Sequence, residues 1–116
     1  MLLCLCLAAC GELQAPPQYW QGIEIAIETR PNPPKVGMNE VLVVATRPGR
    51  QAEYKLLVSI RVREDEAWTQ SIQDGHTGIF RRALALQEPG AQTLWVRLER
   101  GKEQTVLKFP LTVLTE

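Results

Sequence analysis

His76, the only histidine of this 116-residue chain, lies in the segment Asp74-Gly-His-Thr-Gly78. Met38 follows Gly37 in a second predicted turn that contains glycine. Imidazole and thioether groups are soft ligands that suit copper(I), so His76, Met38 and Asp74 form a candidate copper site, in which the aspartate is the least suitable ligand. The alternative is that His76 is a solvated loop residue beside a turn-forming aspartate, a common role for Asp in turns.

Groups that could carry out covalent or acid–base catalysis are few. Ser59 and Ser71 are the only serines, and neither lies in a nucleophile-elbow sequence. The run Glu64-Asp65-Glu66 could supply paired carboxylates, but three acidic residues in a predicted turn are more typical of a solvated loop. We therefore expect no catalytic site and no enzymatic activity.

All three cysteines occur within the first ten residues. Residues 1–9 form an apolar run that ends in small side chains, as secretory signals do, and the run is shorter than the ~20 residues of a membrane-spanning helix. The sequence Leu7-Ala8-Ala9-Cys10, followed by Gly11, resembles the lipobox of bacterial lipoproteins. The alternative, a buried first strand or helix at residues 2–10, is disfavoured because the run shows no polar alternation.

The lipobox resemblance implies a signal peptide at residues 1–9 and a mature protein that begins at Cys10, lipidated with palmitate. Residues 10–19, which contain Pro16-Pro17, would then tether a domain to the bacterial cell envelope. The domain would face the periplasm, with the outer membrane favoured over the inner one. Because no Lys or Arg precedes the apolar run, either the true start of the chain lies upstream of Met1, which we favour, or the free amino group alone supplies the positive charge.

The charges argue against one class of partner. The chain has 13 basic and 13 acidic residues, which are interspersed rather than gathered in blocks. A formally neutral chain has no overall field that would attract the phosphates of DNA or RNA, so we expect no nucleic-acid partner.

Residues 20–116 alternate apolar and polar side chains in short segments, which is the period of half-buried strands. Glycine or proline marks most of the connections, and no window has a sustained helical period. The pattern predicts a single seven-stranded antiparallel sandwich, with Pro110 at an edge or a bulge. The predicted strands lie near Ile23–Ile27, Val41–Thr46, Tyr54–Val62, Trp68–Ile72, Ile79–Leu86, Leu94–Leu98 and Val106–Leu114.

Two stretches resemble a known family. Pro31–Val44 contains Pro-x-x-Gly-x-Asn before an apolar strand, and Gly78–Gly90 reads Gly-x-Phe, a strand and Pro-Gly before the outgoing Leu94-Trp-Val96. They resemble the two halves of YtkA-like and FixH-like domains, which are Ig-like sandwiches of exported bacterial proteins. The resemblance implies an all-β, seven-stranded antiparallel Ig-like β-sandwich and a link to copper handling or oxidase assembly. However, Arg61–Gln73 lacks the methionines and histidines common in that family.

The tryptophans are candidates for a contact surface. If the aliphatic residues of Leu94–Leu98 face inward, Trp95 faces outward, and an exposed Trp is a typical contact point. Trp20 could bind a partner or lie in the membrane interface, or it could close the open end of the core. Trp68 lies either in the core or on a sheet face.

These features favour a lipid-anchored envelope protein that acts as a non-enzymatic interaction or assembly module. Its partner would be another envelope protein, contacted through Trp95 and Trp20, and it would need no cofactor. The alternative is a periplasmic copper-binding or metallochaperone domain linked to oxidase assembly, with His76, Met38 and Asp74 as the ligands.

Overall fold

The computed structural model describes residues 15–115, a part of the chain that consists of strands joined by turns. It contains no helix that is long and apolar enough to cross a membrane. The signal peptide expected at residues 1–9 and the lipidation expected at Cys10 lie outside the described residues. The strands are β1 (Gln18–Trp20), β2 (Ile23–Arg30), β3 (Gly37–Arg47), β4 (Gln51–Ala52), β5 (Leu57–Arg61), β6 (Thr69–Gln70), β7 (Ile72–Gln73), β8 (Ile79–Leu86), β9 (Gly90–Arg100) and β10 (Glu103–Val113).

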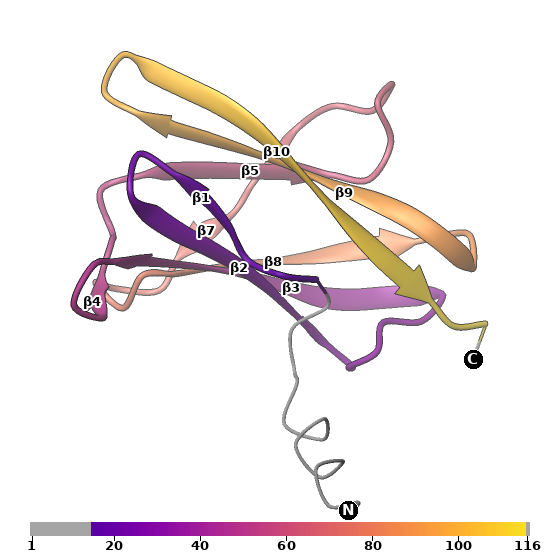
Figure 1. Ribbon diagram of the computed structural model, residues 1–116. Helices are drawn as coiled ribbons and strands as arrows, with labels where there is room; N and C mark the ends of the chain where they lie inside the picture. Colours follow the sequence, from indigo (N-terminus) through magenta and orange to yellow (C-terminus); the bar gives the residue numbers. More distant parts are fainter. Residues whose placement is uncertain (1–14, 116) are drawn as a thin grey trace, which may run out of the picture.

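The strands form two antiparallel sheets that pack face to face (Figure 1). One sheet has six strands, in the order β1-β2-β3-β8-β7 with β4 paired to β3, and the other has four, in the order β10-β9-β5-β6. When β1, β4 and β6 are set aside, this is the strand order of an Ig-like sandwich. Counted in chain order, the first, second, fifth and fourth of the remaining seven strands (β2, β3, β8 and β7) form one sheet. The third, sixth and seventh (β5, β9 and β10) form the other. The predicted all-β antiparallel sandwich is therefore confirmed.

The described chain has more strands than the seven predicted from the alternation, and one of the differences is informative. The segment expected as one strand, Trp68–Ile72, is divided, because β6 pairs with β5 in one sheet and β7 pairs with β8 in the other. Between them Ser71 is buried, and its N–H donates to the carbonyl of Val58 at 2.8 Å. The chain thus changes sheets at Ser71, which leaves each of the two strands only two residues long.

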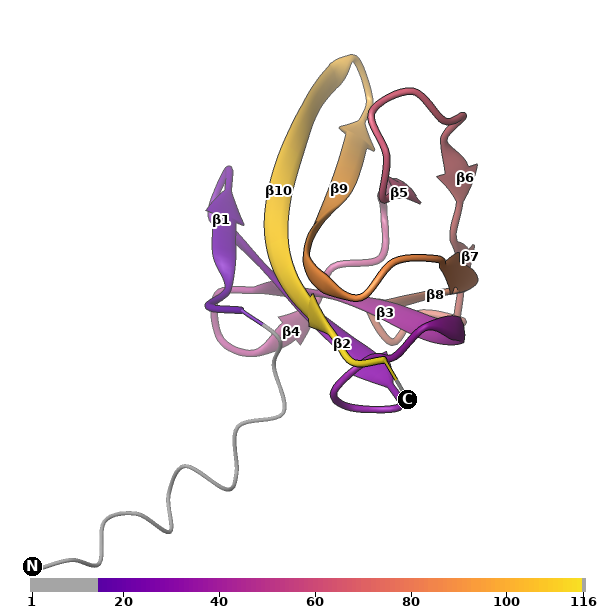
Figure 2. The same cartoon turned by 90° about the vertical axis from the view of Figure 1, so that its right-hand side faces the viewer.

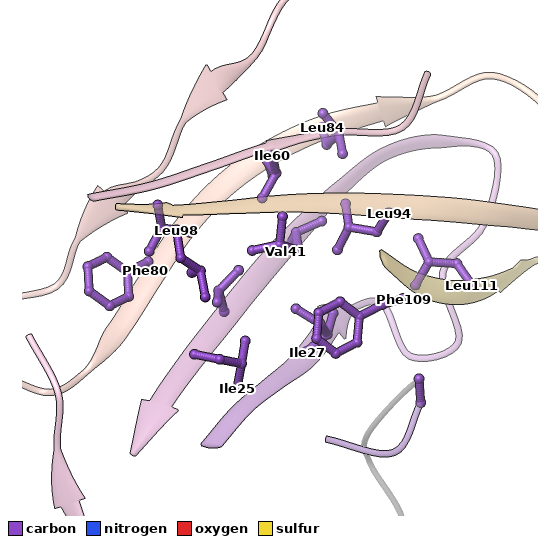
Figure 3. Packing of buried hydrophobic residues seen from close by; sticks show 14 of the residues in the cluster. Ile25, Ile27, Val41, Ile60, Phe80, Leu84, Leu94, Leu98, Phe109 and Leu111 are labelled. Carbon is purple, nitrogen blue, oxygen red and sulfur yellow. The ribbon is translucent and has the colours of Figure 1, made fainter. Parts of the chain in front are cut away.

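Alternation along the long strands directs apolar side chains into one core between the sheets (Figure 3). Burying one such side chain fully stabilises a fold by about 1.5–3 kcal/mol. The core is continuous across both sheets, and it fixes which side chains point outward. Its largest members with no more than 2% exposure include Ile23, Ile25, Ile27, Val41, Val43, Ile60, Phe80, Leu94, Leu98, Phe109 and Leu111.

The domain begins before the boundary predicted at residue 20. Ala15 is buried in the core, and β1 forms a hairpin with β2 through Gln21 (φ 54°) and Gly22 (φ 80°). Two positive φ values define a type I′ turn, whose twist suits a hairpin. Nε2 of Gln18 donates to the carbonyl of Lys108 at 2.6 Å, so β1 also reaches the edge of the other sheet (Figure 2). Residues 15–19, expected as part of the tether, therefore belong to the sandwich.

The Pro-x-x-Gly-x-Asn motif stabilises the turn between β2 and β3. Asn39 is buried, its Oδ1 accepts from the N–H of Lys35 at 3.1 Å, and its Nδ2 donates to the carbonyls of Lys35 at 2.7 Å and Gly37 at 2.9 Å. Gly37 has a φ of 113°, a conformation that favours glycine. One buried amide thus satisfies backbone groups that the turn itself leaves unpaired.

The Gly-x-Phe motif has an equally structural explanation. A side chain at Gly78 would place its Cβ 2.6 Å from the carbonyl oxygen of Ala45, and Gly78 also has a φ of +81°. Phe80 is part of the core. Both motifs behind the family resemblance therefore build turns and core of the sandwich.

Pro110 lies within β10 without interrupting its pairing, which with β9 runs from Glu103 to Val113. The carbonyl of Lys108 and the backbone N–H and carbonyl of Leu114 bond to segments other than β9. In β10 the backbone N–H and carbonyl groups of the even-numbered residues therefore point away from β9. Pro110 has the same parity, so its missing N–H falls on the side away from β9. Because β10 is the last strand of its sheet, the predicted edge position is confirmed.

Candidate functional site

The outer face of the four-stranded sheet carries a row of alternating cations and tryptophans. Lys108 of β10 lies opposite Trp95 of β9, and Trp95 lies opposite Arg61 of β5. The register of β5 and β6 then places Trp68, the residue before β6, beside Arg61. Because adjacent strands are about 4.8 Å apart, these side chains stand in line across the sheet. The outward position predicted for Trp95 is confirmed.

Neighbours in this row make cation–π contacts. Nζ of Lys108 lies 4.5 Å from the centroid of the Trp95 ring, and Cζ of Arg61 lies 5.4 Å from the same ring and 4.1 Å from that of Trp68. Arg97, two residues after Trp95 on β9, adds a second guanidinium 4.8 Å from the Trp68 centroid. Such contacts contribute about 0.5–1 kcal/mol each at exposed sites and more when desolvated. We call these five residues the aromatic–cationic face.

The guanidinium groups of this face are held mainly by the rings. Nη1 of Arg61 donates to the carbonyl of Glu66 at 3.2 Å, whereas its buried Nε has no acceptor among the described residues. Nε of Arg97 lies 3.3 Å from Oε2 of Glu99, which makes an ion pair without hydrogen-bond alignment. A guanidinium can stack on a ring while its edge still offers donors. The face therefore presents fixed positive charges, with Glu99 beside Arg97 and with Asp65 of the adjacent turn within electrostatic reach of Arg61.

The outer face of the six-stranded sheet has a different composition. Glu24 and Glu28 of β2 and Glu40 of β3 occupy its outward positions. Nε of Arg81, on β8, donates to Glu40 at 3.0 Å, and its Nη1 donates to Asp74 at 3.4 Å. The hydrogen bond from Arg81 holds the pKa of Glu40 below its ordinary value, despite the opposing effect of burial. We call this surface, on which Arg81 pairs with Glu40 and Asp74, the ion-paired face.

The three predicted metal ligands do not come together. Met38 lies at the start of β3, whereas the loop that holds Asp74 and His76 enters β8 where that strand pairs with Val44. Six residues of β3 separate the two positions, which corresponds to about 20 Å along a strand. A single site built from Met38, Asp74 and His76 is therefore wrong. Within residues 15–115, no three His, Cys, Asp or Glu side chains gather closely enough to hold a metal ion.

Asp74 and His76 have other partners in the structure. Oδ2 of Asp74 accepts from Arg81, and the carbonyl of Asp74 accepts from the hydroxyl of Thr77 at 2.7 Å. The exposed His76 stacks on Tyr54, with the ring centroids 4.2 Å apart. These contacts match the alternative in which His76 belongs to a turn organised by an aspartate.

Trp20 has an environment different from that of Trp95. It packs against the core from β1, with the guanidinium of Arg100 5.8 Å from its ring. Nη2 of Arg100 donates to Oε1 of Gln21 at 2.6 Å, and its Nη1 lies 3.6 Å from the buried carboxylate of Glu53. Trp20 therefore closes the edge between the two sheets, which is the core-closing alternative considered from the sequence.

The acidic turn considered for catalysis is held by local contacts. Oε2 of Glu66 accepts from the N–H of Val62 at 3.0 Å, and Nε of Arg63 lies 3.3 Å from Oδ1 of Asp65. Of the two serines, Ser71 occupies the crossover between sheets, and Ser59 is buried on β5. The carboxylates therefore stabilise the turn, and the two serines belong to a strand and to the crossover between the sheets.

Sequence reasoning missed the partnership between Trp68 and Arg61. The available signal was their equal distance from the centre of the turn at Glu64-Asp65, because residues equidistant from a turn face each other in an antiparallel hairpin. The same rule, applied to the turn at Gly101-Lys102, places Trp95 opposite Lys108, and these two residues are paired in the register of β9 and β10.

The two packed antiparallel sheets define the class of protein, an antiparallel β-sandwich domain. The chain is similar to the crystal structure of a DUF4426 family protein from Pseudomonas aeruginosa PAO1, determined at 2.09 Å resolution. The TM-score is 0.57, with 9% sequence identity, over 86% of this chain and 97% of that one. At this identity the likeness concerns the fold alone. No family description and no curated protein matches the sequence.

Proposed function

We propose that this protein is a non-enzymatic binding module that is anchored to the bacterial envelope by lipid on Cys10 and contacts another envelope protein. The aromatic–cationic face is its contact surface. The proposal combines the lipobox resemblance of Leu7–Cys10 with the character of that face.

The observation that carries the proposal is the row from Lys108 to Trp68. Tryptophan and arginine are, with tyrosine, the residues enriched among those that dominate binding energy in protein interfaces. Here two tryptophans and two arginines lie together on one sheet face, and all four are partly buried. Side chains held by their neighbours lose less conformational freedom on binding than free ones, which lowers the cost of association.

The test is crosslinking of the full-length protein in intact envelopes, followed by its purification and identification of the attached proteins. We expect one partner to be enriched with the natural sequence and to be lost with Trp95→Ala. Tyr19→Ala is the matched control, because Tyr19 is an exposed aromatic outside the face (65% exposed) and its loss should leave the yield unchanged. No enrichment, or equal enrichment with Trp95→Ala, would contradict the proposal.

The anchor is tested separately by Cys10→Ala, which we expect to move the protein from the membrane to the soluble fraction and to abolish palmitate labelling. Retention in the membrane without label would refute lipidation and leave the contact surface to be judged on its own.

The copper-binding alternative would now depend on His76 without Met38, and Asp74 is already bonded to Arg81. The YtkA-like and FixH-like resemblance is its remaining support, and the two motifs of that resemblance have structural explanations. We therefore favour the binding module.

A further inference from the structure

We infer that the partner presents an acidic polypeptide segment, whose carboxylates pair with Arg61, Arg97 and Lys108 on the aromatic–cationic face. This inference rests on the proposed function and specifies the chemistry of the partner.

The first step is the occupancy of the ring faces. Trp95 has Lys108 on its β10 side and Arg61 on its β5 side, at 4.5 and 5.4 Å from its ring centroid. A sugar ring or a second aromatic group could stack on Trp95 only by displacing one of these cations. A partner that approaches the sheet therefore meets cations held between rings rather than an open aromatic platform.

The second step is the charge balance of the face. The outward positions of β5, β6, β9 and β10 carry three cations, which are Arg61, Arg97 and Lys108, and a single carboxylate, Glu99. Glu99 is paired with Arg97, so no outward carboxylate of these strands pairs with Arg61 or Lys108. Asp65, in the turn next to Arg61, also feels the charge of Arg61, but its carboxylate is already bonded to Arg63. Charge complementarity then favours a carboxylate-bearing partner.

The third step concerns hydrogen-bonding capacity. Arg61 directs one hydrogen bond to a backbone carbonyl, of Glu66, and its side chain is fixed between Trp68 and Trp95. A guanidinium offers five N–H donors in a rigid fork that matches a carboxylate. Because Nε of Arg61 is buried and Nη1 already donates to Glu66, the end of the guanidinium formed by Nη1 and Nη2 is the part that can receive a carboxylate at the centre of the face.

The fourth step separates an acidic polypeptide from an anionic membrane surface. Attraction to anionic lipids usually depends on clusters of about four to eight long, freely moving Lys or Arg side chains. Here the two arginines are partly buried and stacked on tryptophan, and one of them is paired with Glu99. Such fixed charges suit discrete carboxylates better than a fluid layer of headgroups.

The test uses the full-length protein in neutral detergent and a fluorescent poly-L-glutamate peptide as the probe, with binding followed by anisotropy. We expect saturable binding that weakens as salt is added. Arg61→Gln and Lys108→Gln should each weaken it roughly threefold to tenfold, the loss expected for one charge-assisted contact. Arg81→Gln is the matched control, because Arg81 is already paired with Glu40 and Asp74, and it should leave the affinity unchanged.

Arg61→Lys sharpens the result, because it keeps the charge but loses the planar fork, and we expect it to bind less tightly than the natural protein. Absence of poly-L-glutamate binding would overturn the inference, as would an equal loss with Arg81→Gln. Binding to phosphatidylglycerol vesicles but not to poly-L-glutamate would also overturn it, in favour of a membrane surface. If crosslinking still captures a partner through Trp95 when poly-L-glutamate does not bind, the proposed function stands and only the acidic chemistry fails. If poly-L-glutamate binds but crosslinking captures no envelope partner, the carboxylate preference of the face stands and the proposed function fails.

Discussion

The outer faces of the two sheets differ in the groups that surround their arginines. On the ion-paired face, Arg81 is hydrogen-bonded to Glu40 and Asp74. On the aromatic–cationic face, Arg61 is stacked on Trp68 and Trp95 and has one backbone acceptor. The first arrangement neutralises the charge within the molecule, whereas the second holds the charge in place and leaves it available. The difference teaches that the number of arginines on a face says less about binding than the groups beside them.

The largest expected effect comes from removing the ring that carries two guanidinium groups. Trp68→Ala should lower the free energy of unfolding by about 2–3 kcal/mol, because Arg61 and Arg97 lose their stacking partner. Urea denaturation followed by circular dichroism measures the change. Tyr19→Ala, at an exposed position, should stay within about 0.5 kcal/mol. If the two variants cost the same, the rings do not stabilise this face as described.

A smaller effect on the free energy of unfolding is expected from replacing Arg61 and Arg81, each by methionine. Arg61→Met keeps an apolar stem but loses the cation–π contacts with two rings, and it should cost about 1 kcal/mol. Arg81→Met breaks partly exposed ion pairs and should cost about 0.5 kcal/mol or less. Urea midpoints at equal slope report both values. A larger cost for Arg81→Met would reverse the comparison between the faces.

The smallest effect concerns pH. Because the pKa of Glu40 is lowered in the folded state by its hydrogen bond with Arg81, its contribution to stability is complete above its ordinary value of 4.5. That contribution is lost as the pH falls through the lowered value. The stability difference between the natural protein and Glu40→Gln should therefore shrink on acidification.

The stability difference between the natural protein and Arg61→Met should change much less with pH, because a guanidinium stays charged and its ring partners do not titrate there. Thermal unfolding across the acidic range distinguishes the two, and a constant difference for Glu40→Gln would contradict the role of Arg81.

Much of the sandwich was predictable because strand alternation is a local signal. The period at Leu94–Leu98 directs Trp95 outward, and the structure agrees. The partner of Trp95 was predictable in principle as well, since the turn at Gly101-Lys102 determines which residues face each other. The position of Arg61 beside Trp68 follows from the same kind of counting.

Other features depend on contacts that no local pattern reveals. The burial of Asn39 and its bonds to Lys35 and Gly37 require the folded turn. The distance between Met38 and His76 depends on the register of β3 and β8, which brings their turns to opposite ends of the same strand pair. Two glycine-containing turns can look equivalent in a sequence and yet lie at opposite ends of a sheet.

Pro110 has a consequence for how copies of this domain behave at high local concentration. A long edge strand with regularly spaced donors is a template on which another chain can add a strand, and this is a common route to aggregation. In β10 the donor row is interrupted at Pro110. On one side of it the carbonyl of Lys108 accepts from Gln18, and on the other the N–H of Leu114 donates to Pro34 while its carbonyl accepts from Val36. The edge is therefore a poor template for strand addition. Copies that crowd together therefore cannot readily extend the four-stranded sheet at β10, which leaves association at this edge to side chains.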